Sequence, residues 1–363
     1  MRVERLRIEH LRLIDAAEIA PGPSLNLFTG ANGAGKTTVL EAIHVLAYGR
    51  SFRSTSREAL VARGNEWATI HAELRSASEA ALRRIGFACS ARNWQARVDG
   101  ENVSTLGEVL RHCPVVCFEP GSHALIAGGS EHRRRFVDWG LFHVEQEFLP
   151  VWRRYHRALK QRNALLKSAP SDAELAPWDS ELAEWGEALH ALRQNYVDAL
   201  SAAVAEMTQA LMPEAGVPSL HYQPGWRHER EPLAQALAQA RGRDRATGHS
   251  SVGPHRANWS LGFEALPGRE VFSRGQEKLA ALICVLAQAE HFAGRRGEWP
   301  LIALDDLGSE LDRNHQARAI ETVAERPAQV WITGVETPHG LDAVAAAGLC
   351  RFHVEQGVVQ RLG

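Results

Sequence analysis

The chain has 363 residues, of which 45% are hydrophobic and 23% charged, and its formal net charge is −2. These values are typical of a globular protein with two or three domains, and they argue against a generally basic nucleic-acid binder. The charged start MRVERLRIEHLRLID and the absence of any apolar run of about 18 residues argue against export and a membrane span, and five cysteines in mostly apolar segments suit a reducing cytoplasm.

The first predicted elements are a strand and a helix joined by a glycine-rich turn. In LFTGANGAGKTTVLEAI, residues 27–43, the spacing of Gly30, Gly35, Lys36 and Thr37 matches the P-loop pattern. Backbone N–H groups of such a turn hold nucleotide phosphates, the lysine reaches the β- and γ-phosphates, and the threonine hydroxyl binds Mg²⁺. A plain glycine-rich turn would have no need of the Lys-Thr pair. The predicted nucleotide-binding residues of the turn are Gly30, Ala31, Asn32, Gly33, Ala34, Gly35, Lys36, Thr37 and Thr38.

After the P-loop helix, the first 110 or so residues read as a β-rich region. WATIHAEL and ALRRIGFACS predict strands, and Asp99-Gly100 between two strand-like runs predicts a type I′ hairpin. HCPVVC predicts a core strand rather than a zinc site, because two cysteines four residues apart in a strand make a poor ligand set.

From about Ser130 to Pro213 apolar residues recur at helical spacing. The segment KSAPSDAELAPWD contains two prolines and predicts the connection between two long antiparallel helices. Residues 131–167 carry nine Lys and Arg against four Asp and Glu, whereas residues 172–212 carry one Arg against eight acids. Pairing between the two helices is one use of these charges. The later basic stretch RGRDRATGHSSVGPHRANW reads as a loop.

The strand LIALDD, residues 301–306, ends in two acids and has the form of a Walker B motif. We expect Asp305 to hold Mg²⁺ and Asp306 to polarise the attacking water. Burying adjacent carboxylates costs free energy unless a metal or hydrogen-bond donors compensate, so a purely structural role is disfavoured.

SRGQEK, residues 273–278, opens the last long predicted helix, with Ser273 as N-cap and Gln276 three residues on. Together with the P-loop, LIALDD and the following SELD, it resembles the signature motif of ABC-type ATPases, with Ser309 to Asp312 as the D-loop. That resemblance implies that Ser273, Gly275 and Gln276 complete the nucleotide site of a second subunit, and that ATP drives dimerisation. Thr37 and Ser273 are 236 residues apart, too far for a transporter subunit and too close for a long SMC coiled coil.

Over nearly its whole length the chain resembles the RecF family of bacterial recombination mediators. The resemblance is carried by LRIEHLRLID, GANGAGKTTVLEAIHVLAYGRSFRS, GGSEHRRRFVDWGLFH, LKQRNALLK, GPHRANW, SRGQEK and LDDLGSELD. It implies an α/β fold: an ABC/SMC-type ATPase head with a β-rich N-terminal lobe and a short helical arm inserted between Walker A and the signature. We expect residues 1–113 and 246–363 to form the head and 114–245 the arm.

The resemblance also implies a weak, DNA-stimulated ATPase with ATP and Mg²⁺ as cofactors. Such a protein forms an ATP-dependent homodimer, binds duplex DNA near single-strand gaps or junctions, and acts with RecR and RecO to place RecA in DNA repair, replication restart and the SOS response. Catalysis would rest on Asp306, Lys36 and Ser273, and the metal on Thr37 and Asp305. Arg12 is carried over from related repair ATPase heads as a nucleotide contact. The usual Q-loop glutamine and switch histidine are not evident near Glu119 and Thr333.

The DNA-binding candidates are arginines. Arg50, Arg53 and Arg57 share one loop with several hydroxyls, which suits phosphate contacts, although a solvated basic loop explains them equally well. Arg133, Arg134 and Arg135 are consecutive on a helix, so they cannot all face one partner helix, and some are free for DNA or a second subunit. Two other readings stay open: a scaffold that holds ATP only as a structural ligand, and another short-armed repair ATPase.

Overall fold

The computed structural model describes residues 1–76, 81–168, 170–266, 272–344 and 348–362, and its contacts divide the chain into two units. The first unit comprises residues 1–122, 206–213 and 273–363, and the second comprises residues 123–205 and 214–272. These limits differ from the expected ones at 113/114 and 245/246. The strand after residue 113 pairs within the head sheet, and the hairpin before residue 272 packs with the helices of the second unit.

An antiparallel sheet forms one layer of the first unit, in the order β2-β1-β4-β5-β6-β7. In β4 every second residue is buried, so one face of the sheet packs on the core and the other faces solvent. Asp99 and Gly100 both have positive φ, 52° and 90°, between β6 and β7, which confirms the predicted type I′ turn. The strands are β1 (Arg2–Leu11), β2 (Ile14–Ile19), β4 (Ala68–Arg75), β5 (Arg83–Cys89), β6 (Trp94–Val98) and β7 (Glu101–Asn102).

The second sheet of this unit has the order β14-β13-β3-β12-β11-β8 and is parallel except at β14. Its central strands β3, β11 and β12 are almost wholly buried, as expected where both faces are covered. HCPVVC supplies β8, which confirms the core-strand prediction. The strands are β3 (Leu25–Thr29), β8 (Val115–Phe118), β11 (Leu301–Leu304), β12 (Val330–Gly334), β13 (Leu349–Glu355) and β14 (Val358–Leu362).

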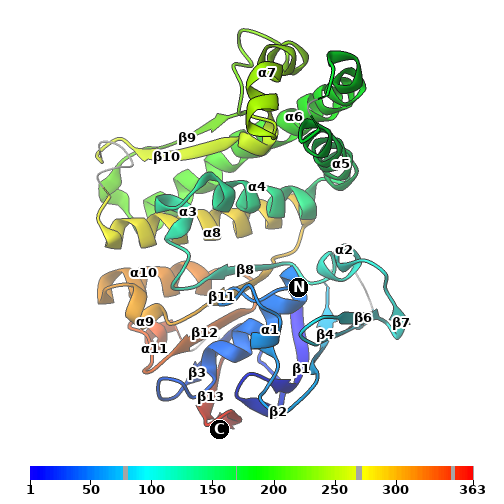
Figure 1. The fold of residues 1–363 in the computed structure, drawn as a ribbon. Helices are drawn as coiled ribbons and strands as arrows, with labels where there is room; N and C mark the ends of the chain where they lie inside the picture. The colour runs from blue at the N-terminus through cyan, green and yellow to red at the C-terminus, as the bar shows by residue number, and fades with distance from the viewer. Residues whose placement is uncertain (77–80, 169, 267–271, 345–347, 363) are drawn as a thin grey trace. The chain divides into compact units, whose positions relative to one another are not determined.

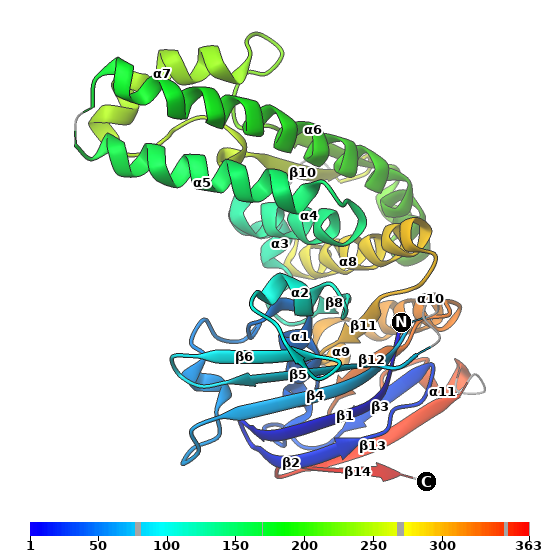
Figure 2. The same ribbon diagram turned by 90° about the vertical axis from the view of Figure 1, so that its right-hand side faces the viewer.

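The core of the first unit lies between the two sheets and includes helix α1 (Lys36–Tyr48) (Figure 2). Phe28 of β3 stacks between Trp331 and Phe352, at ring-centroid distances of 5.3 and 4.6 Å. This packing holds the start of α1 beside the carboxyl ends of the parallel strands, where ligands bind in open α/β sheets. The other helices of this unit are α2 (Leu106–Leu110), α8 (Arg274–Arg296), α9 (Leu307–Glu310), α10 (Arg313–Ala324) and α11 (Leu341–Val344), with a 3₁₀ turn at Glu58–Leu60.

The second unit is mainly helical, as predicted, with one antiparallel hairpin of β9 (Pro218–Gln223) and β10 (Asn258–Phe263) (Figure 1). Two details differ from expectation. Helix α6 begins at Asp172 and contains Pro177, which loses only one helical hydrogen bond near the helix start. The basic stretch expected as a loop is helical as far as Thr247. The helices are α3 (Ala124–Ala127), α4 (Ser130–Val144), α5 (Phe148–Leu166), α6 (Asp172–Leu211) and α7 (Leu233–Thr247), with 3₁₀ turns at Pro213–Ala215 and Pro254–Arg256. The last residues of α6, from Glu206 on, belong to the first unit.

Buried ion pairs join the helices of this unit. Arg162 of α5 is fully buried and donates to Asp179 of α6 at 2.6 Å and to Asp244 of α7 at 2.8 Å. Arg241 bonds the second oxygen of Asp179 at 2.8 Å. The ion pair between Arg162 and Asp179 therefore confirms pairing between the basic helix α5 and the acidic helix α6 at this position. No helix in the described part of the chain is long and apolar enough to cross a membrane.

Candidate nucleotide site

The P-loop turn connects β3 to α1. Gly33 and Gly35 have φ values of 76° and 114°, and a Cβ at Gly30 would lie 2.1 Å from the carbonyl oxygen of Val354. Glycine is therefore needed where the loop turns and where it passes β13. The Lys36 ammonium group is folded back on the turn and donates to the carbonyls of Gly30 and Ala31, both at 2.9 Å.

The acids of LIALDD lie at the end of β11, next to the P-loop. Thr37 Oγ1 donates to Asp305 Oδ1 at 2.9 Å, which joins two predicted metal ligands separated by 268 residues in the sequence. Asp306, the next residue, has left-handed backbone angles (φ 51°, ψ 42°), which aspartate tolerates better than most residues.

Thr333, at the end of β12, connects the two acids. Its hydroxyl donates to Asp305 Oδ1 at 2.6 Å and accepts the backbone N–H of Asp306 at 2.9 Å. The side chain is fully buried. The sequence did not indicate this role, because it depends on the pairing of β11 with β12.

The electrostatics of these groups follow from burial and proximity. Burial lowers the pKa of Lys36, and the nearby charges of Asp306 and Asp305 partly oppose this. Burial raises the pKa of Asp305, against the hydrogen bonds from Thr333 and Thr37. The buried Asp305 carboxylate is costly to ionise unless a cation compensates its charge, and the Thr37 hydroxyl lies beside it. This pair fits Mg²⁺, which prefers oxygen ligands and takes only one or two carboxylates from the protein.

Arg12 directly follows β1 and is held by Glu41 of α1. Its guanidinium donates to both carboxylate oxygens, and the contact to Oε1 measures 2.6 Å. Glu41 is fully buried and also accepts from the Ser51 hydroxyl. The Ser51 oxygen in turn accepts the backbone N–H of Arg53 at 2.8 Å. Arg12 is thus fixed in direction by a buried carboxylate that sequence reasoning did not single out.

The loop with the first three DNA candidates follows Ser51. Arg50 and Arg53 are exposed and Arg57 is half-buried. Arg53 lies 4.0 Å from Glu41, so this loop is tied to the same carboxylate as Arg12.

The signature residues begin helix α8. Ser273 and Gln276 form the predicted capping box, with the Ser273 N–H donating to Gln276 Oε1 at 2.9 Å and the Gln276 N–H to Ser273 Oγ at 3.3 Å. Ser273 and Gly275 are exposed. Lys278 forms an ion pair at 2.9 Å with Glu310, so the signature helix is joined to the predicted D-loop.

The three consecutive arginines of α4 have different environments. Arg133 is buried and donates to Asn258 Oδ1 at 2.6 Å and to the Gly128 carbonyl at 2.8 Å, so its selection as a DNA-binding candidate is wrong. Its position faces the hairpin β9–β10 rather than solvent. Arg134 is half-buried and donates to the Ala257 carbonyl at 2.8 Å. Arg135 is exposed and pairs with Glu131 one turn earlier.

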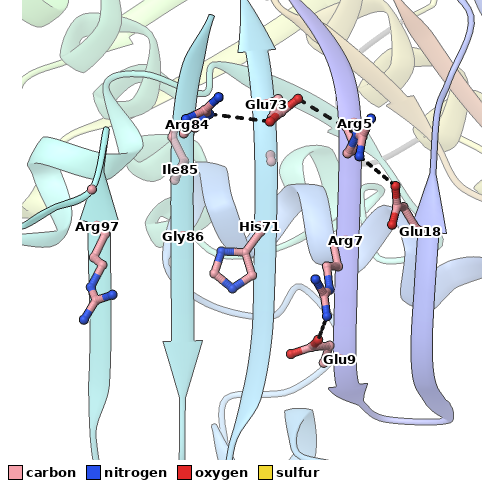
Figure 3. Close-up of a pocket in the computed structure, with 12 residues that line it drawn as sticks. Arg5, Arg7, Glu9, Glu18, His71, Glu73, Arg84, Ile85, Gly86 and Arg97 are labelled. Atoms are coloured by element: carbon pink, nitrogen blue, oxygen red, sulfur yellow. Dashed lines mark hydrogen bonds and ion pairs between the residues drawn. The ribbon is translucent and has the colours of Figure 1, made fainter.

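A set of charged side chains that sequence reasoning missed lies on the outer face of the antiparallel sheet (Figure 3). Strand register places Arg7, His71, Gly86 and Arg97 in one row across β1, β4, β5 and β6. The arginines have partners nearby: Arg7 pairs with Glu9 at 2.6 Å, and Arg97 donates to Asn102 at 2.9 Å. These charged residues lie on separate strands, and only the register of strand pairing brings them together, so the sequence did not show the cluster.

The segment GPHR forms a buried hydrogen-bonded centre in the second unit. The His255 Nε2–H donates to the Ser250 carbonyl at 2.9 Å, so Nδ1 accepts from the Tyr155 hydroxyl at 2.7 Å. Burial lowers the pKa of His255 to about 4. Arg193 donates to the Pro254 carbonyl at 2.7 Å and to both oxygens of Asp138 at 2.8 Å. In this structure the segment connects α4, α5 and α6.

Known proteins agree with this architecture. The RecF/RecN/SMC N-terminal domain family matches residues 2–359. The "DNA replication and repair protein RecF" of Stenotrophomonas maltophilia (strain R551-3) is 51% identical over 362 residues, and that of Xanthomonas axonopodis pv. citri (strain 306) is 53% identical over 364 residues; each match covers 99% of both chains.

Among solved structures, "Structure of the recombination mediator protein RecF-ATP in RecFOR pathway" superposes with a TM-score of 0.87 at 26% identity, covering 99% of this chain and 97% of that chain. An Smc head bound to the C-terminal winged-helix domain of ScpA has a TM-score of 0.59 at 14% identity, covering 100% of this chain and 98% of that chain, a likeness of fold alone.

The fold and the P-loop site define an ABC/SMC-type ATPase head that carries a second, helical unit. Within that class, the chain belongs to the RecF family of DNA replication and repair proteins.

Proposed function

We propose that the chain binds MgATP at the P-loop, dimerises on it, and uses the dimer to hold DNA. The observation that carries this proposal is the hydrogen-bonded group of Thr37, Asp305, Thr333 and Asp306 beside Lys36. A site that held ATP only as a structural ligand would have no use for a second acid. Here Asp306 is such an acid, and the hydrogen bond from its backbone N–H to Thr333 holds it in place.

Each group of the site has a distinct task in this proposal. The turn residues Gly30 to Thr38 bind the phosphates, and Lys36 exchanges the carbonyls of Gly30 and Ala31 for phosphate oxygens. Thr37 and Asp305 hold Mg²⁺, which neutralises phosphate charge when bound. Asp306 orients and polarises the attacking water. Its side chain is one methylene shorter than the glutamate usual in ABC ATPases, which suits slow turnover. Arg12 reaches the nucleotide from its position on Glu41.

Dimerisation follows from the signature. Ser273, Gly275 and Gln276 lie at the start of helix α8, where Ser273 and Gly275 are exposed and the helix dipole favours a phosphate. We assign these residues to the nucleotide of a second copy. The Lys278–Glu310 ion pair connects them to the D-loop, so contact with the partner's nucleotide is transmitted to the segment that follows Asp306.

The partners follow from the family. The matched relatives are named DNA replication and repair proteins, and the solved neighbour is titled as a recombination mediator in the RecFOR pathway. We infer that the chain binds duplex DNA near single-strand gaps in the cytoplasm, with RecR as a partner and RecO and RecA acting downstream. Among the basic residues, Arg50, Arg53, Arg57, Arg134 and Arg135 remain as candidate contacts for DNA phosphates.

Asp306→Asn tests the coupling of hydrolysis to DNA release. The amide keeps size and hydrogen bonding but removes the charge that polarises water, so ATPase activity should fall by about 10²–10⁴-fold while MgATP binding and dimerisation persist. The variant should then stay on gapped DNA longer than wild type after competitor DNA is added. Lys36→Ala, which should lose ATP binding altogether, serves as the negative control. Slow hydrolysis with unchanged DNA release would favour the scaffold function instead.

A further inference from the structure

A cavity of about 640 Å³ in the second unit is lined by aromatic and polar side chains that no part of the nucleotide site uses. Its wall consists of His190 and Gln194 of α6, the last two residues of β9, and the loop from Pro224 to Arg230. The volume lies within the range of about 300–1,000 Å³ that is usual for ligand sites.

Four rings meet in this cavity. His190 stacks on Tyr222 at 5.7 Å with an interplanar angle of 13°, and it lies 4.2 Å from the ring of His228. Trp226 meets His190 edge-on at 5.1 Å. At the rim, Arg227, His228, Glu229 and Arg230 are exposed. A ring-lined pocket with cations at its mouth suits a flat heteroaromatic ligand that carries a phosphate.

The buried polar atoms point to the same chemistry. Among the residues that the structure describes, His190 Nδ1 and Trp226 Nε1 are buried without a hydrogen-bond partner. His190 is 7% exposed, and burial lowers its pKa, so the neutral ring offers both a donor and an acceptor. Leaving such groups unpaired costs about 1–3 kcal/mol each, and a hydrogen-bonding ligand would relieve that cost when bound.

The loop that carries Trp226 is anchored at both ends. Gly225 has a φ of 93°, its carbonyl accepts the Gly253 N–H at 3.2 Å, and a Cβ there would lie 2.3 Å from the Gly253 oxygen. On the other side, the Leu233 N–H donates to Glu187 of α6 at 2.7 Å. The cavity is therefore formed before any ligand arrives, which lowers the ordering cost of binding.

We propose that this cavity, the arm pocket of His190, Tyr222, Trp226 and His228, binds an unpaired base of single-stranded DNA. Every base has a flat face for the rings and acceptor atoms for the indole N–H, and Arg227 and Arg230 lie where the flanking phosphates would pass. The inference rests on the proposed DNA-binding function and deepens it, because it says that the second unit of the chain binds the single-stranded DNA of a gap.

The test compares three DNAs, each with ATP: a duplex with an oligo(dT) gap, the same duplex with an abasic gap, and an intact duplex. Base stacking on an aromatic side chain is worth about 1–3 kcal/mol, so Trp226→Ala should weaken binding to the dT-gapped duplex by about 5- to 150-fold. Binding to the other two DNAs should not change. Trp226→Phe keeps a ring but loses the N–H, and it should lie between wild type and Trp226→Ala.

Two controls separate the pocket from general damage. Trp185→Ala removes a tryptophan from α6 outside the pocket and should leave all three affinities unchanged. Wild-type protein on a gap that contains 5-iodouracil should photo-crosslink to the peptide with Trp226 or Tyr222. Equal affinity of Trp226→Ala and wild type for the dT gap, or crosslinks only elsewhere, would overturn the arm pocket alone. A wild-type chain that binds none of the DNAs would overturn the proposed function and this inference with it.

Discussion

Replacing Thr333 by Val separates the hydrogen bonds of this residue from its shape. The hydroxyl donates to Asp305 and accepts the Asp306 N–H, and the side chain is fully buried, so valine leaves both partners without this bond in a place that solvent does not reach. A hydrogen bond to a charged group is worth about 1.5–3 kcal/mol and a neutral one about 0.5–1.5 kcal/mol. We therefore expect a loss of about 2–4 kcal/mol in the free energy of unfolding of the head.

The same change should reduce ATP turnover more than ATP binding. Lys36 and the P-loop turn are untouched, but Asp306 loses the contact that orients its backbone, and a displacement of about 1 Å at a reacting group can cost about 10²-fold in rate. Urea unfolding and steady-state ATPase assays with gapped DNA measure the two effects. Thr333→Ser is the matched control, because it keeps the hydroxyl and removes one methyl group. If Thr333→Val and Thr333→Ser behave alike in both assays, packing and not hydrogen bonding holds Asp305 and Asp306 in position.

Three further predictions test other parts of the chain. Ser273→Arg should leave ATP binding by the monomer nearly intact and block the ATP-dependent dimer in sedimentation; loss of monomer binding would place Ser273 in its own site. The raised pKa of Asp305 stabilises the fold only at low pH, and this stabilisation is lost as the pH rises through the raised pKa. Asp305→Asn should therefore raise the melting temperature of the nucleotide-free protein at pH 7 and reduce the further increase that MgATP causes. A lower melting temperature of the variant without nucleotide would contradict this. The pKa of His255 is lowered from 6.5 to about 4, so the neutral ring contributes to stability above pH 6.5, and this contribution declines as the pH falls toward 4. The free energy of unfolding of the second unit should therefore fall by about 2 kcal/mol between pH 7 and pH 5. His255→Asn should remove that pH dependence in urea unfolding, and the exposed His132→Asn should not; equal slopes would refute the assignment.

The sequence alone determined the elements whose geometry is local. A P-loop needs glycines, a lysine and a threonine at set positions along one turn, so its pattern can be recognised from adjacent residues. The capping box at Ser273 and the Asp99-Gly100 turn are local in the same sense, and both were predictable. LIALDD was also readable, because a buried strand that ends in two acids is rare without a ligand.

The tertiary structure decided whatever depends on which segments meet. Thr333 reaches Asp305 only because β12 pairs with β11, and Glu41 holds Arg12 only because α1 packs beside β1. Arg133 looked accessible on its helix, yet the hairpin β9–β10 buries it. The rings of the arm pocket come from a helix, a strand and a loop. Exposure and side-chain partners are properties of three-dimensional packing, and spacing along one segment carries no information about a neighbour that lies a hundred residues away.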